Sequence, residues 1–400
     1  MPQLWAGIDA GKSNHHCVVI DETGTRLLSR KVANEEDDVL ALLADVTELA
    51  DSAPISWATD SNQGGAALLI AVLAAHGQEM LYVPGRTVHH AARTYRGDSK
   101  TDAKDAAIIA DQTRMRRDIF PIRDGDEIAA ELRMLAAHRT DLVADKTRAI
   151  NRLRATLLGY FPGLEAAFDY ATRKAALVLL TKYQTPAQLR RSGVTRVTAW
   201  LRNAGCHNPA AVAEAAVDAA NRQHSVVPGQ DAAALIVARL AREVLRLKEE
   251  VEEVESQLET RFRRHEWADT LLSIPGFGPL LAAEFIGATG GTMRHFANAD
   301  RLAGTAGAAP VPCDSGRISG NLHRPKRYDR RLLRACYMSA EVATRHHPES
   351  RTYYDRKRAE GKRHKQAMLA LAHRRINVIW ALLRDGTTYQ QRSLTTLAAA

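Results

Sequence analysis

Short apolar runs alternate with amphipathic segments over the first 120 residues. The runs LWAGIDAG, HHCVVID and RLLSRKVA predict three strands in a meander, over residues 4–11, 15–21 and 26–33. Beyond them the pattern predicts helices over 36–49 and 64–77, strands over 54–60 and 79–84, and a helix that opens at Thr101. Strands interleaved with helices indicate an α/β domain whose helix-covered sheet binds ligands at the carboxyl ends of its strands.

The middle of the chain has helical periodicity. Residues 127–164 predict a long helix that stops at Pro162-Gly163. Over residues 232–262 the apolar positions recur at alternating spacings of four and three, at Leu240, Val244, Leu247, Val251, Val254 and Leu258. This heptad seam is typical of a coiled coil, and an amphipathic helix packed on its own chain has the same pattern. Either interpretation predicts an extended helical module, and the coiled coil would also favour self-association.

A glycine-rich turn follows the helical module. In LLSIPGFGPLLAAEFIG, residues 271–287, Pro275, Gly276 and Gly278 separate two helical segments. The pattern is similar to the helix-hairpin-helix signature, in which backbone N–H groups at a helix start approach a DNA phosphate. An ordinary turn between helices would use the same residues.

The positive charge of the chain is concentrated at its C-terminal end. Residues 301–400 carry 20 Lys and Arg against 7 Asp and Glu, whereas residues 1–300 carry 35 against 39. Such asymmetry favours a polyanionic partner, nucleic acid above all, while a merely solubilising surface would mix both signs. The four cysteines form no CxxC pair and are expected to be free thiols. No apolar run is long enough to span a bilayer, which predicts a cytoplasmic protein.

Four aspartates are expected to meet at one edge of the predicted sheet. Asp9 and Asp60 end predicted strands, and Asp102 and Asp105 follow the predicted N-cap Thr101. Residues three apart on a helix share a face, with Cβ atoms roughly 5–6 Å apart, so these carboxylates would repel one another unless a cation lay among them. Hard divalent ions such as Mg²⁺ or Mn²⁺ prefer such ligands. A simpler explanation is that aspartates favour the positive end of a helix.

The same first strand allows a second interpretation. GIDAGKSN also looks like the phosphate loop of sugar kinases and actin-like ATPases. That interpretation lacks a glycine-rich adenosine-binding turn further along the chain, and a basic tail is unusual for a small-molecule kinase.

A candidate nucleophile lies in CDSGRISG. Ser315 is flanked by glycine and followed by a series of cations, Arg324, Lys326, Arg327, Arg330, Arg331 and Arg334. Serine attacks phosphorus only when it is activated, and arginines can stabilise the charge that develops there. Ser319 competes for this role, and a loop serine is often only a turn residue.

Several of these segments together resemble the serine transposases of the insertion-sequence 110 family, most closely its actinobacterial branch. The resemblance rests on GIDAGKSNHHCVVID, WATDSNQGGAALLIAVLAAHGQ, LYVPGRTVHHAARTYRGDSKTDAKDAAIIADQTRMRRD, LLSIPGFGPLLAAEFIG and LAGTAGAAPVPCDSGRISG. It implies a RuvC-like nuclease domain of the RNase H fold over 1–125, a helical linker with a coiled coil over 126–265, and a mainly α-helical transposase domain over 266–400. The acidic quartet would be Asp9, Asp60, Asp102 and Asp105, and the nucleophile Ser315. Many relatives carry Glu where this chain has Asp60.

The resemblance also implies a mechanism and partners. DNA would be cut and rejoined through a phosphoserine intermediate, with a structured noncoding RNA pairing with donor and target DNA so that the protein reads duplex shape. Separately, the acidic quartet and the serine lie about 200 residues apart in the chain, and strand exchange involves two DNAs, so we expect a homodimer or tetramer with a site shared across protomers. It would be cytoplasmic and associated with a bacterial nucleoid. Two other functions stay open: a metal-dependent, junction-resolving nuclease that uses water, and a protein that only binds RNA or DNA.

Overall fold

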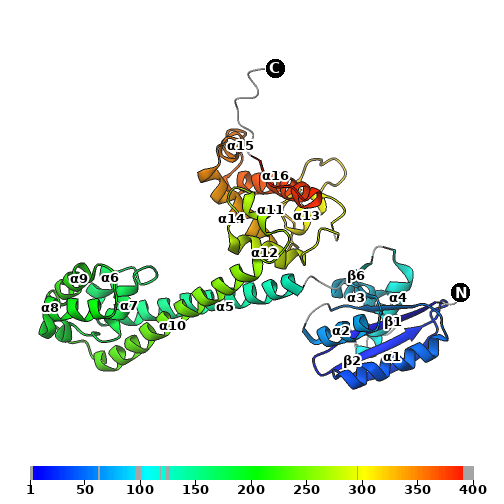
Figure 1. The fold of residues 1–400 in the computed structure, drawn as a ribbon, viewed down its shortest axis with the longest axis horizontal. Helices are drawn as coiled ribbons and strands as arrows, with labels where there is room; N and C mark the ends of the chain where they lie inside the picture. Colours follow the sequence, from blue (N-terminus) through cyan, green and yellow to red (C-terminus); the bar gives the residue numbers. More distant parts are fainter. Residues whose placement is uncertain are drawn as a thin grey trace, which may run out of the picture. The chain divides into compact units, whose positions relative to one another are not determined.

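The chain folds into an α/β unit and a helical unit. The computed structural model describes residues 3–61, 64–95, 101–117, 119–122, 127–294 and 296–390. It divides into two compact units, residues 1–125 and 126–400 (Figure 1). The predicted fold class, an α/β domain followed by a mainly helical remainder, is therefore confirmed. In the described ranges, no helix is both long and apolar enough to cross a membrane.

A six-stranded mixed sheet forms the centre of the first unit. Its strands are β1 (Leu4–Ala10), β2 (Asn14–Ile20), β3 (Arg26–Ala33), β4 (Ile55–Thr59), β5 (Met80–Tyr82) and β6 (Phe120–Ile122), in the order β3-β2-β1-β4-β5-β6. The first three strands form an antiparallel meander, β4 and β5 continue parallel to β1, and β6 is antiparallel to β5. The carboxyl ends of β1, β4 and β5 thus lie at one edge of the sheet.

Helices cover both faces of this sheet. They are α1 (Glu36–Ala50), α2 (Ala67–Ala75), α3 (Gly85–Ala91) and α4 (Asp102–Met115), with 3-10 turns η1 (Gly64–Ala66) and η2 (Ala92–Thr94). Because side chains alternate along a strand, Leu4, Ala6 and Ile8 of β1 pack with α1 and α2, whereas Trp5 lies on the face that α4 covers (Figure 1). Asp9 belongs to this second face.

Periodicity located most of these elements to within two residues, and the predicted N-cap of α4 is confirmed. Thr101 accepts a hydrogen bond from the backbone N–H of Lys104 at 3.2 Å. Two short elements were missed, α3 and β6. A seven-residue helix with two histidines and a three-residue strand that contains Pro121 are both too short to show a period.

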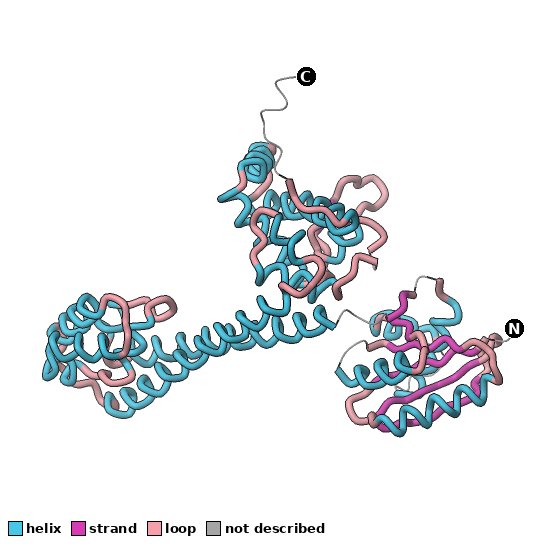
Figure 2. The backbone as a smooth tube through the Cα atoms, in the orientation of Figure 1, coloured by secondary structure: helices cyan, strands magenta, loops and turns pink. Residues whose placement is uncertain are grey.

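Among its described residues, the second unit is built of helices and one small hairpin. Its elements are α5 (Glu127–Leu158), α6 (Pro162–Ala167), α7 (Lys174–Leu180), α8 (Pro186–Asn203), α9 (Pro209–Asn221), α10 (Gln230–Phe262), α11 (Ala268–Ser273), α12 (Pro279–Thr289), α13 (Ala299–Thr305), β7 (Val311–Pro312), β8 (Leu322–His323), α14 (Arg330–His346), α15 (Pro348–Ala359) and α16 (His364–Asp385). Figure 2 shows this change from strands to helices along the chain. The predicted helix over 127–164 is wrong at its end, because α5 stops at Leu158 and Pro162 begins α6, where a missing N–H costs nothing.

The heptad seam packs on its own chain. All six seam residues, from Leu240 to Leu258, are buried in a core shared with α5. Two ion pairs fix the antiparallel register of α5 and α10: Arg139 with Glu255 at 2.6 Å and Arg261 with Glu131 at 2.9 Å. The seam is therefore buried within the protomer.

Close helix packing joins α5 to the C-terminal helices. A Cβ on Gly287 of α12 would lie 2.9 Å from the backbone nitrogen of Arg133 on α5, so glycine is required at this crossing. α12 packs in turn on α14, and α14 packs on α15 and α16. These contacts join α5, α12 and the basic helices α14, α15 and α16 in one framework.

Candidate functional site

Asp9 and Asp60 lie on neighbouring strands. β1 and β4 are parallel and their paired register ends with Ile8 opposite Thr59, so each aspartate stands one step beyond the last pair. Neighbouring strands are about 4.8 Å apart, and both aspartates belong to the face that α4 covers. We call Asp9, Asp60, Asp102 and Asp105 the acidic edge.

A glycine brings α4 to this edge. A Cβ on Gly7 of β1 would lie 2.3 Å from both the carbonyl oxygen of Ala106 and the backbone nitrogen of Ala110. The helix backbone therefore lies directly on the strand, which no larger residue would permit. Asp102 and Asp105 occupy the first turn of α4: Asp102 lies about one turn before Ala106, and Asp105 directly precedes it. They are thus carried toward the strand end at which Asp9 lies.

Electrostatic coupling connects these groups. Burial raises the pKa of the Asp60 carboxyl above its ordinary value, and the charge of Asp105 raises it further, against backbone N–H groups of Asp60 and Ala10 that lower it. Asp102 acts on His16, which pairs with Asp9 across the β1–β2 hairpin. Burial lowers the pKa of His16, and Asp102 opposes this change, whereas Arg26 and Lys31 reinforce it. All four aspartates are therefore at or next to one end of the sheet.

The acidic edge has the donor chemistry of a divalent cation site. Its four carboxylates are hard oxygen ligands. Burial and the charge of Asp105 both raise the pKa of Asp60, so the ionised form of this carboxylate is disfavoured, and a nearby cation would stabilise it. In the ranges that the structure describes, no three His, Cys, Asp or Glu side chains are gathered closely enough to hold a metal ion. The four aspartates therefore have the right chemistry and lie at the same end of the sheet. Among the described residues, however, their carboxylates do not converge on a common metal position.

Two residues near the acidic edge were missed in the sequence. His16 lies opposite Asp9, and burial together with Asp60 raises the pKa of Tyr82 at the end of β5. Their signal is strand register alone: His16 pairs with Asp9, and Tyr82 pairs with Thr59, the residue before Asp60. The neighbouring Asp111 has a structural role, because it accepts hydrogen bonds from Arg114 at 2.7 Å and from the Tyr95 hydroxyl. Asp98, from the same acidic stretch, lies outside the described residues.

Ser315 lies near the tip of a β-hairpin in the second unit. We call residues 311–323 the serine hairpin. β7 and β8 pair at its base, and Ser315 exchanges two backbone hydrogen bonds with Ile318, of 3.2 and 3.0 Å, around a turn in which Gly316 has a φ of +56°. Both Ser315 and Ser319 are exposed. Residues predicted as a polar loop thus present the serine hydroxyls to solvent.

The predicted cations follow this hairpin. Arg324 lies over the ring of Tyr328 at 4.7 Å and donates a hydrogen bond of 2.8 Å to its hydroxyl. Lys326 and Arg327 are exposed, as are Arg330 and Arg331 in the first turn of α14. Cations at the positive end of a helix are unfavourable unless an anion compensates them. Arg334 differs, because it pairs with the buried carboxylate of Glu284.

The glycine-rich turn packs against α14. Gly276 has a φ of +85°, and a Cβ there would lie 2.4 Å from the carbonyl oxygen of Ser339. The buried Arg375 donates hydrogen bonds to the Pro275 carbonyl and, at 2.7 Å, to the Ser339 hydroxyl. Gly278, by contrast, has open space around its Cβ position, directly before α12. Close packing on α14 explains why residue 276 is glycine. Of the two glycines, Gly278 is the one with space beside it for a phosphate.

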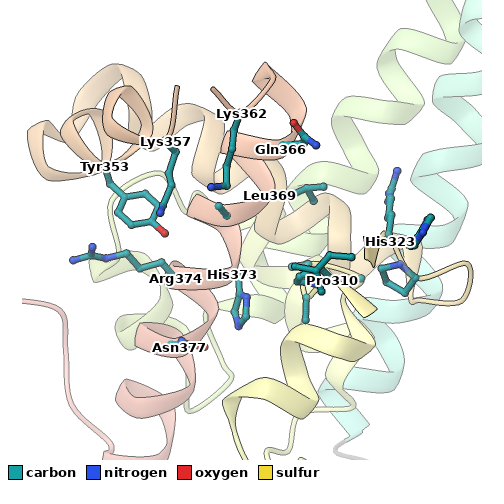
Figure 3. A pocket seen from close by; sticks show the side chains of 17 residues that line it. Pro310, His323, Tyr353, Lys357, Lys362, Gln366, Leu369, His373, Arg374 and Asn377 are labelled. Atoms are coloured by element: carbon teal, nitrogen blue, oxygen red, sulfur yellow. The ribbon is translucent and has the colours of Figure 1, made fainter. Parts of the chain in front are cut away.

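A cavity of about 770 Å³ opens beside the serine hairpin and was not predicted from the sequence. We call it the hairpin cavity. Its walls are residues 307–310, the returning segment 322–325, and side chains of α15, α16 and the turn between them (Figure 3). The segments that form it lie up to 70 residues apart, so no local pattern indicates it.

An acidic sheet edge, an exposed serine and a cationic helical surface are together the features of a protein that acts on nucleic acid. Comparison with known families makes the class specific: residues 6–162 match a family described as transposase, and residues 268–355 match the transposase IS116/IS110/IS902 family. The chain belongs to this family of transposases, whose function is DNA transposition.

Relatives from actinobacterial insertion elements match nearly the whole chain. The IS900 uncharacterized 42 kDa protein of Mycobacterium paratuberculosis is 61% identical over 99% of both chains. The IS116 uncharacterized 44.8 kDa protein of Streptomyces clavuligerus is 48% identical over 96% of this chain and 95% of its own length. The IS110 uncharacterized 43.6 kDa protein of Streptomyces coelicolor is 35% identical over 97% and 96%, respectively.

Proposed function

We propose that this transposase cuts and rejoins DNA through a covalent intermediate on Ser315. The observation that carries the proposal is the position of that serine: exposed on a glycine-containing hairpin, with the exposed cations Lys326, Arg327, Arg330 and Arg331 on the segment that follows. An exposed hydroxyl can reach a phosphodiester that these cations hold by its neighbouring phosphates.

The proposed chemistry exchanges one phosphodiester for another. Ser315 Oγ loses its hydroxyl proton and forms a bond to phosphorus, while the bond between phosphorus and a deoxyribose oxygen breaks and that oxygen takes up a proton. In the second step a deoxyribose hydroxyl loses its proton and attacks the phosphoserine, the bond between phosphorus and Oγ breaks, and Oγ takes up a proton. The energy of the phosphodiester is retained throughout, so rejoining requires no nucleotide cofactor. The arginines stabilise charge on the phosphoryl oxygens in both steps.

In this proposal Asp9, Asp60, Asp102 and Asp105 are the carboxylates that hold a divalent metal ion, Mg²⁺ or Mn²⁺. When bound, such an ion supplies Lewis-acid stabilisation of the oxygens at phosphorus. The carboxylates also keep the edge acidic, so that DNA is repelled from it unless their charge is neutralised. Residues 1–125 would act as the RuvC-like domain and residues 266–400 as the transposase domain, with the helical module 126–265 between them in the chain.

A noncoding RNA of the element is the proposed guide. The basic helices α14, α15 and α16 suit backbone contacts with RNA and DNA alike, because they carry many cations. RNA that copurifies with the full chain should map to the ends of its own element; a random sample of cellular RNA would contradict guidance. We also propose a homo-oligomer, dimer or tetramer, measured by light scattering with and without DNA.

The proposal is tested by looking for protein joined to DNA. The full chain is expressed beside its flanking DNA, lysed in denaturant and examined for a covalent adduct, in the wild type and in Ser315→Ala, Ser319→Ala and Asp102→Ala. We expect an adduct in the wild type and Ser319→Ala, and none in Ser315→Ala. DNA cut in a magnesium-dependent way without any adduct would indicate the water-using nuclease, and retained binding without cleavage would indicate a binding protein.

A further inference from the structure

The hairpin cavity has a strongly cationic rim. Four permanently charged side chains line it, Arg324, Lys357, Lys362 and Arg374, together with His323 and His373, and no carboxylate is among the lining residues. Two acids lie close by: Glu360 pairs with Lys357 and Lys362, both at 2.9 Å, and Asp300 is 3.5 Å from His373. The cations outnumber these acids, so the rim favours an anion.

Part of the cavity wall is apolar. Alanine and proline from residues 308–310, with Leu322, Leu369 and Ala370, form this surface. The ring of Tyr353 lies 4.8 Å from the guanidinium of Arg374 and holds that charge at the rim by a cation–π contact (Figure 3). A bare phosphate would need only the rim. Charge beside an apolar wall instead suits a flat, largely apolar group that carries a phosphate, which is a nucleotide.

The size and position of the cavity agree with this ligand. Its volume of about 770 Å³ lies within the range of roughly 300–1,000 Å³ usual for small-ligand sites. Its wall includes Leu322, which pairs with Pro312. Ser315 stands three residues beyond Pro312, at most about 10 Å along the strand. That separation corresponds to about three nucleotide steps of a duplex strand.

We infer that the hairpin cavity receives one nucleotide of the DNA strand, turned out of its base stack, within a few nucleotides of the phosphodiester that Ser315 attacks. The base lies against the apolar wall, and its phosphate contacts Lys362 and Arg374. This inference rests on the proposed function, because it places the cavity beside the reacting strand. DNA is the favoured source of the nucleotide since the serine hairpin itself forms the wall.

The test uses 2-aminopurine, a base whose fluorescence rises when it leaves the stack. Duplexes that span the junction between element and flank carry this base at successive positions, and the full chain is added with RNA transcribed from the element ends. Ala370→Leu fills the cavity and Lys362→Gln removes a rim charge. Their matched controls are Ala359→Leu and Lys365→Gln, which make the same changes at exposed positions outside the cavity.

We expect one position to brighten several-fold with the wild type and both controls, and to lose most of that signal with Ala370→Leu and Lys362→Gln. DNA that binds the wild type without any position brightening would overturn the inference, as would an undiminished signal in Ala370→Leu. A signal that appears only when 2-aminopurine is placed in the RNA would also overturn it. Adduct formation, assayed in the same samples, reports the proposed function separately.

Discussion

The backbone of α4 approaches β1 so closely that a methyl group on Gly7 would lie 2.3 Å from the main-chain nitrogen of Ala110. No real Cβ atom tolerates such a distance, so the helix rests on the strand only because this residue is glycine. The same contact carries Asp102 and Asp105 to the strand end where Asp9 and Asp60 lie. The acidic edge therefore depends on a residue that has no chemistry of its own.

Replacing this glycine should disturb the acidic edge without touching an acid. Gly7→Ala forces α4 off the sheet, and we expect a loss of about 1–3 kcal/mol or more in the free energy of unfolding, measured by denaturant unfolding. Gly304→Ala is the control, since its Cβ position is open and Gly304 lies within α13. An unchanged stability in Gly7→Ala would contradict the close contact.

Asp60→Asn should stabilise the protein at neutral pH in the absence of divalent ions. Because burial and Asp105 raise the pKa of Asp60, the folded state binds this proton more tightly than the unfolded state, and ionisation costs stability as the pH rises through that pKa. We expect Tm to rise by about 1–4 °C at pH 7, and the gain to vanish at about pH 3.5, below the ordinary Asp pKa. Glu22→Gln, at an exposed turn, should show no such pH dependence.

Magnesium should make the wild type more stable than Asp60→Asn. An ion that binds only the folded state raises Tm, so we expect millimolar Mg²⁺ to stabilise the wild type and to have little effect on Asp60→Asn or Asp105→Asn. Differential scanning fluorimetry with and without EDTA measures this directly. Equal stabilisation of all three proteins by Mg²⁺ would place the ion elsewhere.

The two glycines of the turn after α11 should separate packing from DNA binding. Gly276→Ala meets the Ser339 carbonyl at a positive φ and should lower Tm by several degrees. Gly278→Ala should keep the wild-type Tm, because nothing lies within 4 Å of the added methyl. If the turn binds a phosphate, Gly278→Ala weakens DNA binding in a mobility-shift assay; unchanged binding would remove the turn from the DNA interface.

The exposed arginines at the start of α14 should account for part of the salt dependence of DNA binding. Replacing Arg330 and Arg331 with Gln removes two phosphate contacts, and the slope of log affinity against log salt should become shallower by about 2. Arg334→Gln is the contrast: it leaves the buried Glu284 unpaired and should cost about 1–3 kcal/mol of stability with the slope unchanged. Equal slopes in all three proteins would contradict a phosphate contact at Arg330 and Arg331.

Local sequence patterns predicted the helices and strands but not which of them pack together. The strand ends at Asp9 and Asp60 and the N-cap Thr101 follow from apolar runs and capping residues, which act within a few positions of the chain. The heptad seam from Leu240 to Leu258 was equally clear, yet the pattern could not choose between a partner chain and α5, because both offer the same apolar face.

Contacts between segments that are distant in the chain could not be predicted from the sequence. The packing role of Gly276 depends on Ser339, more than 60 residues further on, and the hairpin cavity combines Leu322 with Lys362 and Arg374. Lys362 lies in the turn between α15 and α16, and Arg374 lies on α16, where neither is distinguished in the sequence from the other cations of a basic helical region. His16 is different: its pairing with Asp9 lies within a hairpin of two neighbouring predicted strands, and only the register of that hairpin had to be known to find it.

The most direct test of the serine intermediate is to map the adduct by mass spectrometry. Trypsin cleaves after Arg317 and so separates Ser315, on the peptide 302–317, from Ser319, on the peptide 318–326, where Pro325 prevents cleavage after Arg324. After nuclease digestion, we predict a nucleotide remnant on peptide 302–317, with fragmentation that assigns it to Ser315. A remnant on peptide 318–326, or cleaved DNA with both peptides unmodified, would contradict the account.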